Sequence, residues 1–420
     1  MLRPNGRPLI RRVWVWSSAI FGVLTVVLVG ARLCMTGTSG VSLFTGDIEQ
    51  VSHVPRDASA RAPYLVRLGD GCMCVVWRGP IVRDGHRGFQ GWSFGYVEWD
   101  GSAFDGSAGA FQGVKAGGRD HCLAAVDGQT IACVVEGASF AREAQNAILW
   151  LVAVAGARGH LSFEPANRPH AALPYSIRGT PRAPVSGHAA DHFLWPLAGN
   201  RGQENYRQPF LCIDHVTGRW YMVGVEDHRG SAGELWFTYS DDKGITWEER
   251  RLFAEGSRPS LVKSANGELL LLFTQSGKYG YQGVWPDDAP EPPPQDQYDW
   301  PGMGPLGLLR SRDGGRTWGD PEVVVASDSV INGRCTVAPD GRLWLVYVEG
   351  PQIGTTALYL TSSADNGKTW ATPVQISDGT RYLDREPDIA VWDDQVLVAF
   401  ARSGLGLAGE NVWVAKMPVN

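Results

Sequence analysis

The stretch Ser240-Asp241-Asp242-Lys243-Gly244-Ile245-Thr246-Trp247 decides the fold of this chain, because its pattern Ser-x-Asp-x-Gly-x-Thr-Trp occurs three times without a mismatch. The other copies run from Ser311 to Trp318 and from Ser363 to Trp370. A short Asp that accepts backbone N–H bonds, a Gly with positive φ and a sealing Trp are typical of a tight turn between strands. Such self-similarity predicts a propeller or a solenoid, and it predicts that these Asp residues hold turns rather than take part in chemistry.

A second repeat combines an Arg or Pro start, an apolar strand, an Asp-Gly-like turn and a second apolar strand. Its units start at Arg61, Arg119, Arg207, Arg258, Arg334 and Arg385, with turns at Asp70-Gly71, Asp127-Gly128, near Gly218, and at Asn266-Gly267, Asp340-Gly341 and Asp393-Asp394. Short apolar runs bounded by turn residues indicate buried strands paired in hairpins. The second repeat therefore predicts six hairpins and an all-β domain.

The eight-residue copies resemble the Asp boxes of the sialidase superfamily. The resemblance implies a six-bladed β-propeller of four-stranded antiparallel blades over residues 56–420, with the boxes on its outer rim. Composition agrees with one large β domain, since 420 residues include 52 Gly, 26 Pro and 17 Trp. A net charge of −6 argues against a general nucleic-acid binder.

The N-terminus carries a membrane signal. Arg residues at 3, 7, 11 and 12 precede an apolar run from Val13 to Val29, which predicts a signal anchor or signal peptide over 1–35 and a linker over 36–55. The positive flank places the bulk of the chain outside the cytoplasm, periplasmic or extracellular. Val29-Gly30-Ala31 could be cleaved and the protein secreted, but Arg32 follows, so an uncleaved anchor is favoured.

The seven cysteines give no obvious disulfide framework. Cys122 and Cys133 are equidistant from the Asp127-Gly128 turn, which predicts that they face each other and could form a bridge. Cys72 and Cys74 share one face of a strand. No zinc-ligand spacing is present, so neither a metal nor a cofactor is predicted.

Chemistry is expected where the innermost strands begin, at the axis of the ring. Each of the six units has an Arg at or just before that start, and six Arg residues at one repeat position in an acidic protein predict a cationic mouth. A planar guanidinium suits bidentate pairing with a carboxylate, so the predicted ligand is anionic. The alternative is that some of these Arg residues bond backbone carbonyls of their own blades.

The resemblance to sialidases also extends to particular residues. Tyr206-Arg207-Gln208-Pro209 resembles the family's Phe/Tyr-Arg-Ile-Pro motif, and Glu386 with Arg402 resembles a later Glu and Arg pair. The resemblance implies that Arg207, Arg402 and Arg61 form a triad around a sugar carboxylate. The remaining axial Arg residues assigned to substrate binding are Arg258 and Arg334.

Sialidases use a Tyr nucleophile activated by a Glu, with an Asp as general acid and base. By that resemblance Glu386 is the activating carboxylate. Asp227, which lies between the Arg207 hairpin and the first box, is the candidate Asp, with Glu234 in reserve. Tyr206 is assigned as the Tyr because it lies near a strand start. The sequence departs from the family here, because only 34 residues follow Glu386 and none is Tyr. In a permuted ring Asp120 stands where Tyr is expected, which leaves Tyr64 and Tyr382 as further candidates.

Three hypotheses follow. The first is a membrane-anchored, sialidase-like exo-glycosidase acting on an acidic sugar. The second is a related propeller that binds an anionic glycan or sialoside without cleaving it. The third is a structural or assembly propeller that docks a membrane protein partner. Two long insertions, Glu164–His188 and Trp285–Pro305, are either surface decoration or lids beside the axis.

Overall fold

The computed structural model describes residues 42–43, 46–53, 60–68, 72–79, 93–99, 101, 104, 109–112, 121–137, 146–155, 161–165, 193–194, 204–228, 233–244, 246–248, 251–275, 303–350, 355–377, 379, 381–404 and 410–419. The predicted anchor over 1–35 lies outside them, as do most of both insertions. Within the described ranges, no helix is long and apolar enough to cross a membrane.

The described strands form antiparallel sheets in chain order. The strands are β1 (Ser42–Leu43), β2 (Asp47–Gln50), β3 (Arg61–Leu68), β4 (Cys72–Arg78), β5 (Ser93–Trp99), β6 (Gly109–Gln112), β7 (His121–Asp127), β8 (Thr130–Gly137), β9 (Asn146–Ala155), β10 (Ser162–Pro165), β11 (Phe193–Leu194), β12 (Glu204–Ile213), β13 (Trp220–His228), β14 (Glu234–Ser240), β15 (Arg251–Glu255), β16 (Ser257–Lys263), β17 (Leu269–Thr274), β18 (Leu306–Ser311), β19 (Glu322–Val325), β20 (Val330–Val337), β21 (Leu343–Glu349), β22 (Ala357–Ser363), β23 (Val374–Gln375), β24 (Tyr382–Trp392), β25 (Gln395–Gly404) and β26 (Asn411–Pro418).

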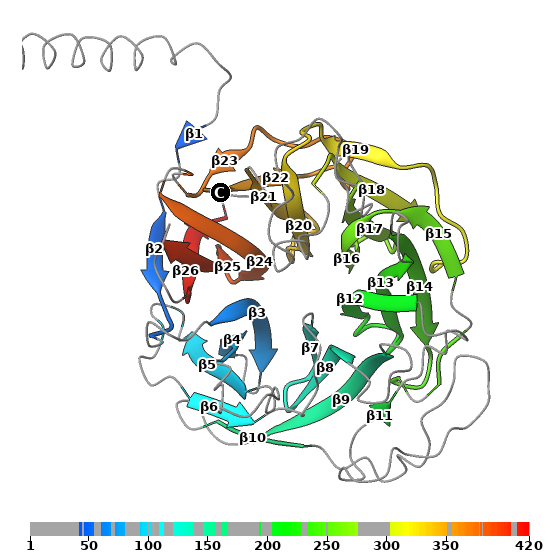
Figure 1. The fold of residues 1–420 in the computed structure, drawn as a ribbon, viewed down its shortest axis with the longest axis horizontal. Coiled ribbons are helices and arrows are strands. Elements are labelled where there is room, and N and C mark those ends of the chain that lie inside the picture. The colour runs from blue at the N-terminus through cyan, green and yellow to red at the C-terminus, as the bar shows by residue number, and fades with distance from the viewer. Residues whose placement is uncertain are drawn as a thin grey trace, which may run out of the picture. The chain divides into compact units, whose positions relative to one another are not determined.

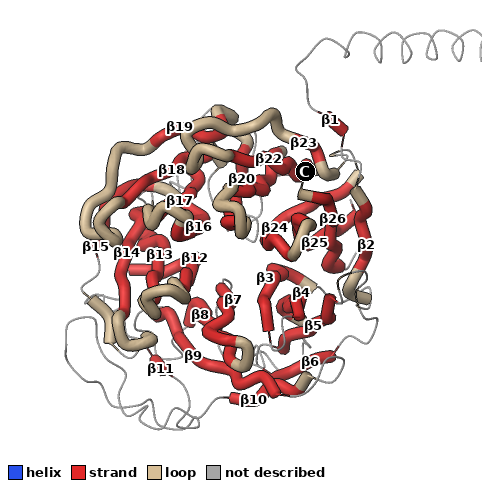
Figure 2. The backbone as a smooth tube through the Cα atoms, turned by 180° about the vertical axis from the view of Figure 1, so that it is seen from behind, coloured by secondary structure: helices blue, strands red, loops and turns tan. Residues whose placement is uncertain are grey.

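Six sheets share one four-strand pattern. Their strand orders are β3-β4-β5-β6, β7-β8-β9-β10, β12-β13-β14-β15, β16-β17-β18-β19, β20-β21-β22-β23 and β24-β25-β26-β2, and β11 also pairs with β9. The sheets stand around a common centre with β3, β7, β12, β16, β20 and β24 innermost (Figure 1). Seen from behind, the fourth strands lie at the rim (Figure 2). The predicted all-β propeller of four-stranded antiparallel blades is confirmed.

The ring closes on itself. Each innermost strand contacts the next, and β24 contacts β3, so the last blade meets the first. The strand β2, which begins the ring in the sequence, pairs antiparallel with the last strand β26, from Asp47 opposite Lys416 to Gln50 opposite Trp413. Apolar residues on facing sheets form the core clusters between neighbouring blades.

The three Asp boxes are turns after the third strand of their blades. In each, Ser donates to the Asp Oδ1 at 2.8 Å and Thr donates to Oδ2 at 2.6 Å. The three box glycines have φ between 77° and 89°, which favours Gly over other residues. The prediction that these Asp residues hold turns is confirmed.

Four innermost strands share a bulge that the sequence repeat only partly indicates. The ladder registers shift between Arg61 and Tyr64, Arg207 and Phe210, Ser257 and Ser260, and Arg385 and Asp388. Within each bulge a residue with positive φ precedes a Pro, namely Ala62 (φ 44), Gln208 (φ 54), Arg258 (φ 52) and Glu386 (φ 53). A bulge re-aims side chains and tolerates Pro in a strand.

One predicted pairing is wrong. Cys122 lies opposite Val134 and Cys133 lies opposite Leu123, so the two cysteines do not face each other. The turn is centred on Gly128-Gln129, with Asp127 opposite Thr130, and after the register shift between Ala125 and Asp127 a one-residue offset from the expected pairing remains. Such a slip moves a side chain to the other face of the sheet. Both cysteines are buried, and neither is in a disulfide.

Candidate functional site

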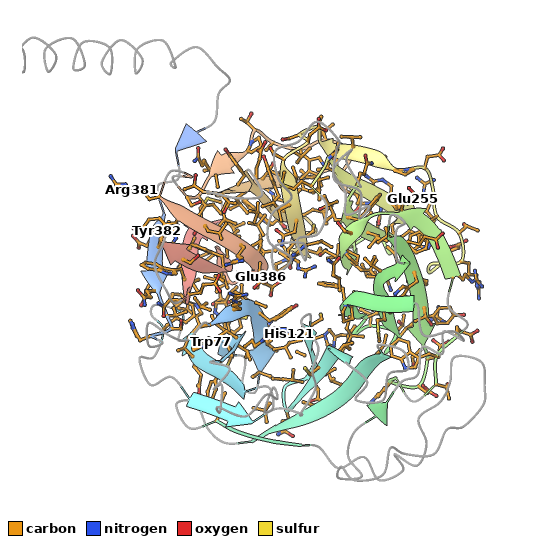
Figure 3. All side chains as sticks on the ribbon, viewed as in Figure 1. Trp77, His121, Glu255, Arg381, Tyr382 and Glu386 are labelled. Carbon is orange, nitrogen blue, oxygen red and sulfur yellow. The ribbon has the colours of Figure 1, made fainter. Side chains whose placement is uncertain are left out.

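Glu386 and His121 lie near each other at the centre of the ring (Figure 3). The Glu386 side chain joins the last blade to the first, because Oε2 accepts a hydrogen bond from the backbone N–H of Ala62 at 2.8 Å. Two residues later, Asp388 Oδ2 accepts the N–H of Leu65, also at 2.8 Å. Strand β24 is thus bonded to β3 through two carboxylates.

The same bond occurs between another pair of blades. Gln208 Oε1 accepts the backbone N–H of Arg258 at 2.6 Å, which connects β12 to β16. Gln208 and Glu386 occupy the same place in their bulges, and so do Arg258 and Ala62. The bulge residue therefore reaches across to the bulge of the next blade, once with an amide and once with a carboxylate.

Three Arg residues surround Glu386, and one further carboxylate engages two of them. Glu410 forms ion pairs with Arg61 and with Arg385, whose Nε donates to Oε1 at 2.7 Å. The Glu410 side chain is almost fully buried, whereas Arg61 is 43% exposed. The third Arg is Arg258, brought there by the backbone of its bulge.

The positive charges around Glu386 determine that its carboxyl group is ionised. Burial pushes the pKa of this carboxyl upward, but Arg385, Arg258, Arg61 and the Ala62 N–H outweigh that effect and hold the pKa below its ordinary value. Glu386 is therefore ionised at neutral pH. An ionised carboxylate can accept a proton, and the lowered pKa makes Glu386 a weaker base than an ordinary carboxylate.

Asp388 and His121 behave differently. Burial raises the pKa of Asp388 to about 6, although the Leu65 N–H and Arg334 oppose the rise. Burial, with the charge of Arg78 nearby, lowers the pKa of His121 to about 3, so this imidazole is neutral. Its ring packs against Tyr64 with centroids 5.2 Å apart, and the Tyr64 hydroxyl donates to the His121 carbonyl oxygen.

Arg402 and Arg334, like Arg61, have protein partners. Arg402 forms a bidentate pair with Asp384, with Nε–Oδ1 at 2.7 Å and Nη2–Oδ2 at 2.9 Å, and its guanidinium lies 4.7 Å from the Tyr382 ring. Tyr382 is drawn on the outer side of its blade, away from Glu386 (Figure 3). Arg334 Nη1 donates to the Pro259 carbonyl at 2.8 Å. This axial Arg therefore bonds a backbone carbonyl of the preceding blade, not of its own blade as the alternative expected.

The prediction that the six Arg residues share one repeat position is wrong for two of them. Arg61, Arg207 and Arg385 directly precede their bulge residues, but Arg258 is itself a bulge residue, with Ser257 in the preceding place. Arg334 lies beyond the shift between Val330 and Asn332. Arg119 is outside the described residues. The offset of Arg258 is already present in the sequence, where this Arg stands directly before its Pro and Arg61 stands two residues before Pro63.

The motif residues on β12 and β13 come together at one end of their hairpin. Tyr206 pairs with Glu226 and Arg207 with Val225, while Asp227 lies opposite Asn205. Glu234 starts the next strand, opposite Glu226. These backbone positions bring the predicted Tyr, Arg and Asp to the start of one inner hairpin; the side chains of Tyr206, Arg207 and Asp227 are not among those described.

Glu410, Asp388 and His121 had no role assigned from the sequence. Asp388 follows the Glu386-Pro387 pair, which was a usable signal. Glu410 has no such signal in the sequence, because it lies outside every repeat. It reaches the site from the residue directly before β26, the last strand. Within the described ranges, no group of three or more His, Cys, Asp or Glu side chains is arranged to hold a metal ion.

Comparisons with known proteins agree with the fold. The model of the BNR repeat-like domain matches residues 306–403. A crystal structure of a Dyadobacter fermentans protein of unknown function is 16% identical, with 90% of this chain and all of that chain covered and a TM-score of 0.56. No match was found among curated protein sequences.

Two sialidases are similar in structure. Trypanosoma rangeli sialidase, in complex with 2,3-difluorosialic acid, is 13% identical over 90% of this chain and 59% of its own, with a TM-score of 0.57. NanB sialidase from Streptococcus pneumoniae is 11% identical over 93% of this chain and 72% of its own, with a TM-score of 0.51. The chain thus spans somewhat over half of the Trypanosoma protein. These likenesses and the BNR repeats identify a sialidase-like β-propeller.

Proposed function

From the sialidase-like propeller and its axial charges, we propose that this protein is a sialidase-type glycoside hydrolase acting on a carboxylate-bearing sugar. The observation that carries the proposal is Glu386, an ionised carboxylate among Arg385, Arg258 and Arg61 at the ring centre. Arg residues of this kind recognise a carboxylate by charge and by paired hydrogen bonds. Glu386 is the group that would activate a nucleophile.

We assign a role to each residue of the site, beginning with the best-supported residues. Arg258 and Arg61 bind the sugar carboxylate, and Arg207 joins them from the β12 bulge. Asp227 is the acid and base, and Tyr206 beside it is the nucleophile. Arg334, on β20, also takes part in binding the substrate. Arg402 is bonded to Asp384 and supports the blade that carries Glu386.

A second candidate is a propeller that binds an acidic glycan without cleaving it. Two contacts favour it. Glu386 already accepts the Ala62 N–H, and Glu410 already neutralises part of the charge of Arg61 and Arg385. In that case the carboxylates are structural, and recognition depends on the Arg residues alone.

The deciding experiment measures turnover and binding separately on the full-length chain. Turnover is followed with 4-methylumbelliferyl sialoside, and binding with free sialic acid, with galactose as the neutral control. Glu386→Gln keeps an acceptor for Ala62, as Gln208 does for Arg258, so it removes charge while preserving the bond. We expect Glu386→Gln to abolish turnover and Arg258→Ala to weaken binding of the acidic sugar about tenfold or more.

The possible results separate the two candidates. Turnover by the parent chain that is lost in Glu386→Gln supports the hydrolase. Sialic acid binding that needs Arg258, without turnover, supports the glycan-binding module. Absence of both, also with a glucuronide substrate, contradicts both candidates.

We further propose that the propeller is exported and anchored by the apolar run from Val13 to Val29. The Arg residues before this run support the orientation. Fractionation of cells expressing the full chain, with protease added from outside, tests it. Mass measurement of the mature N-terminus distinguishes an anchor from a cleaved signal. Recovery of the propeller in the cytoplasm contradicts the proposal.

A further inference from the structure

Two cysteines of the first blade lie close enough to share one ion. Cys72 and Cys74 stand on β4 with one residue between them, and their Sγ atoms are 3.9 Å apart. Neither forms a disulfide. Alternate residues of a strand point to the same face. Here Cys74 belongs to the core cluster between the first and second blades, and Cys72 packs against that cluster.

The two thiols differ in access. Cys74 is fully buried, whereas Cys72 is partly exposed at the start of the strand. An ion can therefore arrive through Cys72 and be covered on the far side by Cys74 and the apolar residues around it. Met73, between them, packs in a different cluster, which confirms that the two sulfurs point to one side together.

From this geometry we propose that Cys72 and Cys74 form a two-thiolate site for a single soft cation, Cu(I). Metal–sulfur bonds of about 2.3 Å allow one ion to join sulfurs up to about 4.6 Å apart, so both sulfurs are within reach without movement of the strand. Thiolates select Cu(I) over harder ions. Zn²⁺ fits less well because its protein sites take three or four ligands, and the described residues offer no group of three.

Proton release must accompany binding. A hydrogen bond to Cys72 and burial, with the charges of Cys72 and of Glu98 opposite, raise the pKa of the Cys74 thiol well above its ordinary value. When Cu(I) binds, two S–H bonds break, two S–Cu bonds form and two protons pass to solvent. Copper and sulfur keep their oxidation states. The affinity should therefore rise with pH.

The test uses the reduced full-length chain under anaerobic conditions, with Cu(I) held by the chelator bathocuproine disulfonate as competitor. We expect the parent chain to retain one Cu(I) against the chelator, and Cys72→Ser to retain it at least about tenfold more weakly. Cys335→Ser is the matched control, since it removes a buried thiol from another blade. The control should leave the affinity unchanged.

A second measurement locates the ion and guards against misfolding. Alkylation of the native protein followed by mass spectrometry should modify Cys72 in the metal-free chain and spare it after one equivalent of Cu(I). The retained copper should also grow with pH as two protons require. The proposal is overturned if Cys72→Ser and Cys335→Ser lose Cu(I) affinity equally, or if one equivalent of Cu(I) leaves the alkylation of Cys72 unchanged. Failure of the parent chain to compete with the chelator also overturns it.

Discussion

Two junctions of the ring use the same bond with different chemistry. At β12 and β16 the amide of Gln208 accepts the N–H of Arg258 at 2.6 Å, and at β24 and β3 the carboxylate of Glu386 accepts the N–H of Ala62 at 2.8 Å. Both acceptors have φ near 53° and precede a Pro. Because an amide is sufficient to connect neighbouring blades, the charge of Glu386 is available for another purpose.

The surroundings of the two junctions support this interpretation. Glu386 is held ionised by three Arg residues. Gln208 carries no charge, so its bond is purely an inter-blade contact. Variants at the two junctions can therefore separate what the ring needs from what the ligand needs.

The largest effect is expected for Glu386→Gln on turnover of the fluorogenic sialoside. The change makes the hydrogen bond of the second junction resemble that of the first, so the loss of unfolding free energy should come from the three Arg residues that lose a counter-charge and should be about 1–3 kcal/mol. Turnover should fall about 10²–10⁴-fold, because the activating charge is lost. Glu322→Gln on the rim, where Arg310 binds the carboxylate, is the control and should keep full activity. Equal activity in both variants would remove Glu386 from the chemistry.

The next effect concerns Glu410, which has no counterpart at the Gln208 junction among the contacts described. Glu410→Ala leaves Arg61 and Arg385 without their shared buried partner, and loss of one member of a buried pair costs about 3–5 kcal/mol. Urea unfolding of the full chain measures this loss. Glu322→Ala, which breaks a half-exposed pair with Arg310, should cost about 1 kcal/mol or less. If the two variants lose similar unfolding free energy, the ion pairs of Glu410 stabilise the closing junction no more than a surface ion pair does.

The sequence predicts some residues of the closing junction better than others. Repeated boxes and hairpins were sufficient for the propeller, because each repeats a local turn whose Asp, Gly and Trp have fixed tasks. Glu386 was found with Arg402 through the resemblance to the sialidase Glu and Arg pair, and Arg61 was found because it starts a repeat unit. Glu410 was not, since its contact with Arg61 depends on how the ring closes and not on local sequence.

Single-residue offsets account for the other errors. The β7–β8 turn is centred on Gly128-Gln129 instead of Asp127-Gly128, which leaves Cys122 opposite Val134. Arg258 stands directly before its Pro, so Ser257 has the place that Arg61 has in its own bulge. In both cases one residue changes which face or neighbour a side chain meets, while the apolar pattern of the strand is unchanged. Spacing alone therefore places residues in the correct blade but not always at the correct position.

A pH-dependent effect should appear at the Glu386 junction only. The folded-state pKa of Asp388 is raised to about 6, above the unfolded value of about 3.9, so its ionised form is disfavoured in the fold. Stability from this group is greatest below pH 4 and falls as the pH rises towards 6. Between pH 4 and pH 7 the parent chain should lose about 2–3 kcal/mol relative to Asp388→Asn. A constant difference between the two proteins would contradict the raised pKa.

The smallest effect is expected for Gln208→Ala. It removes one neutral hydrogen bond between blades, which is worth about 0.5–1.5 kcal/mol, and it should leave sialic acid binding unchanged because no charge is lost. Glu386→Ala removes the corresponding bond and also leaves three Arg residues without that carboxylate, so it should cost more and alter binding as well. Urea unfolding and sialic acid titration of both variants give the two quantities. If both variants lose the same stability and neither changes binding, the carboxylate at the closing junction is equivalent to the amide, and Glu386 serves the ring rather than the ligand.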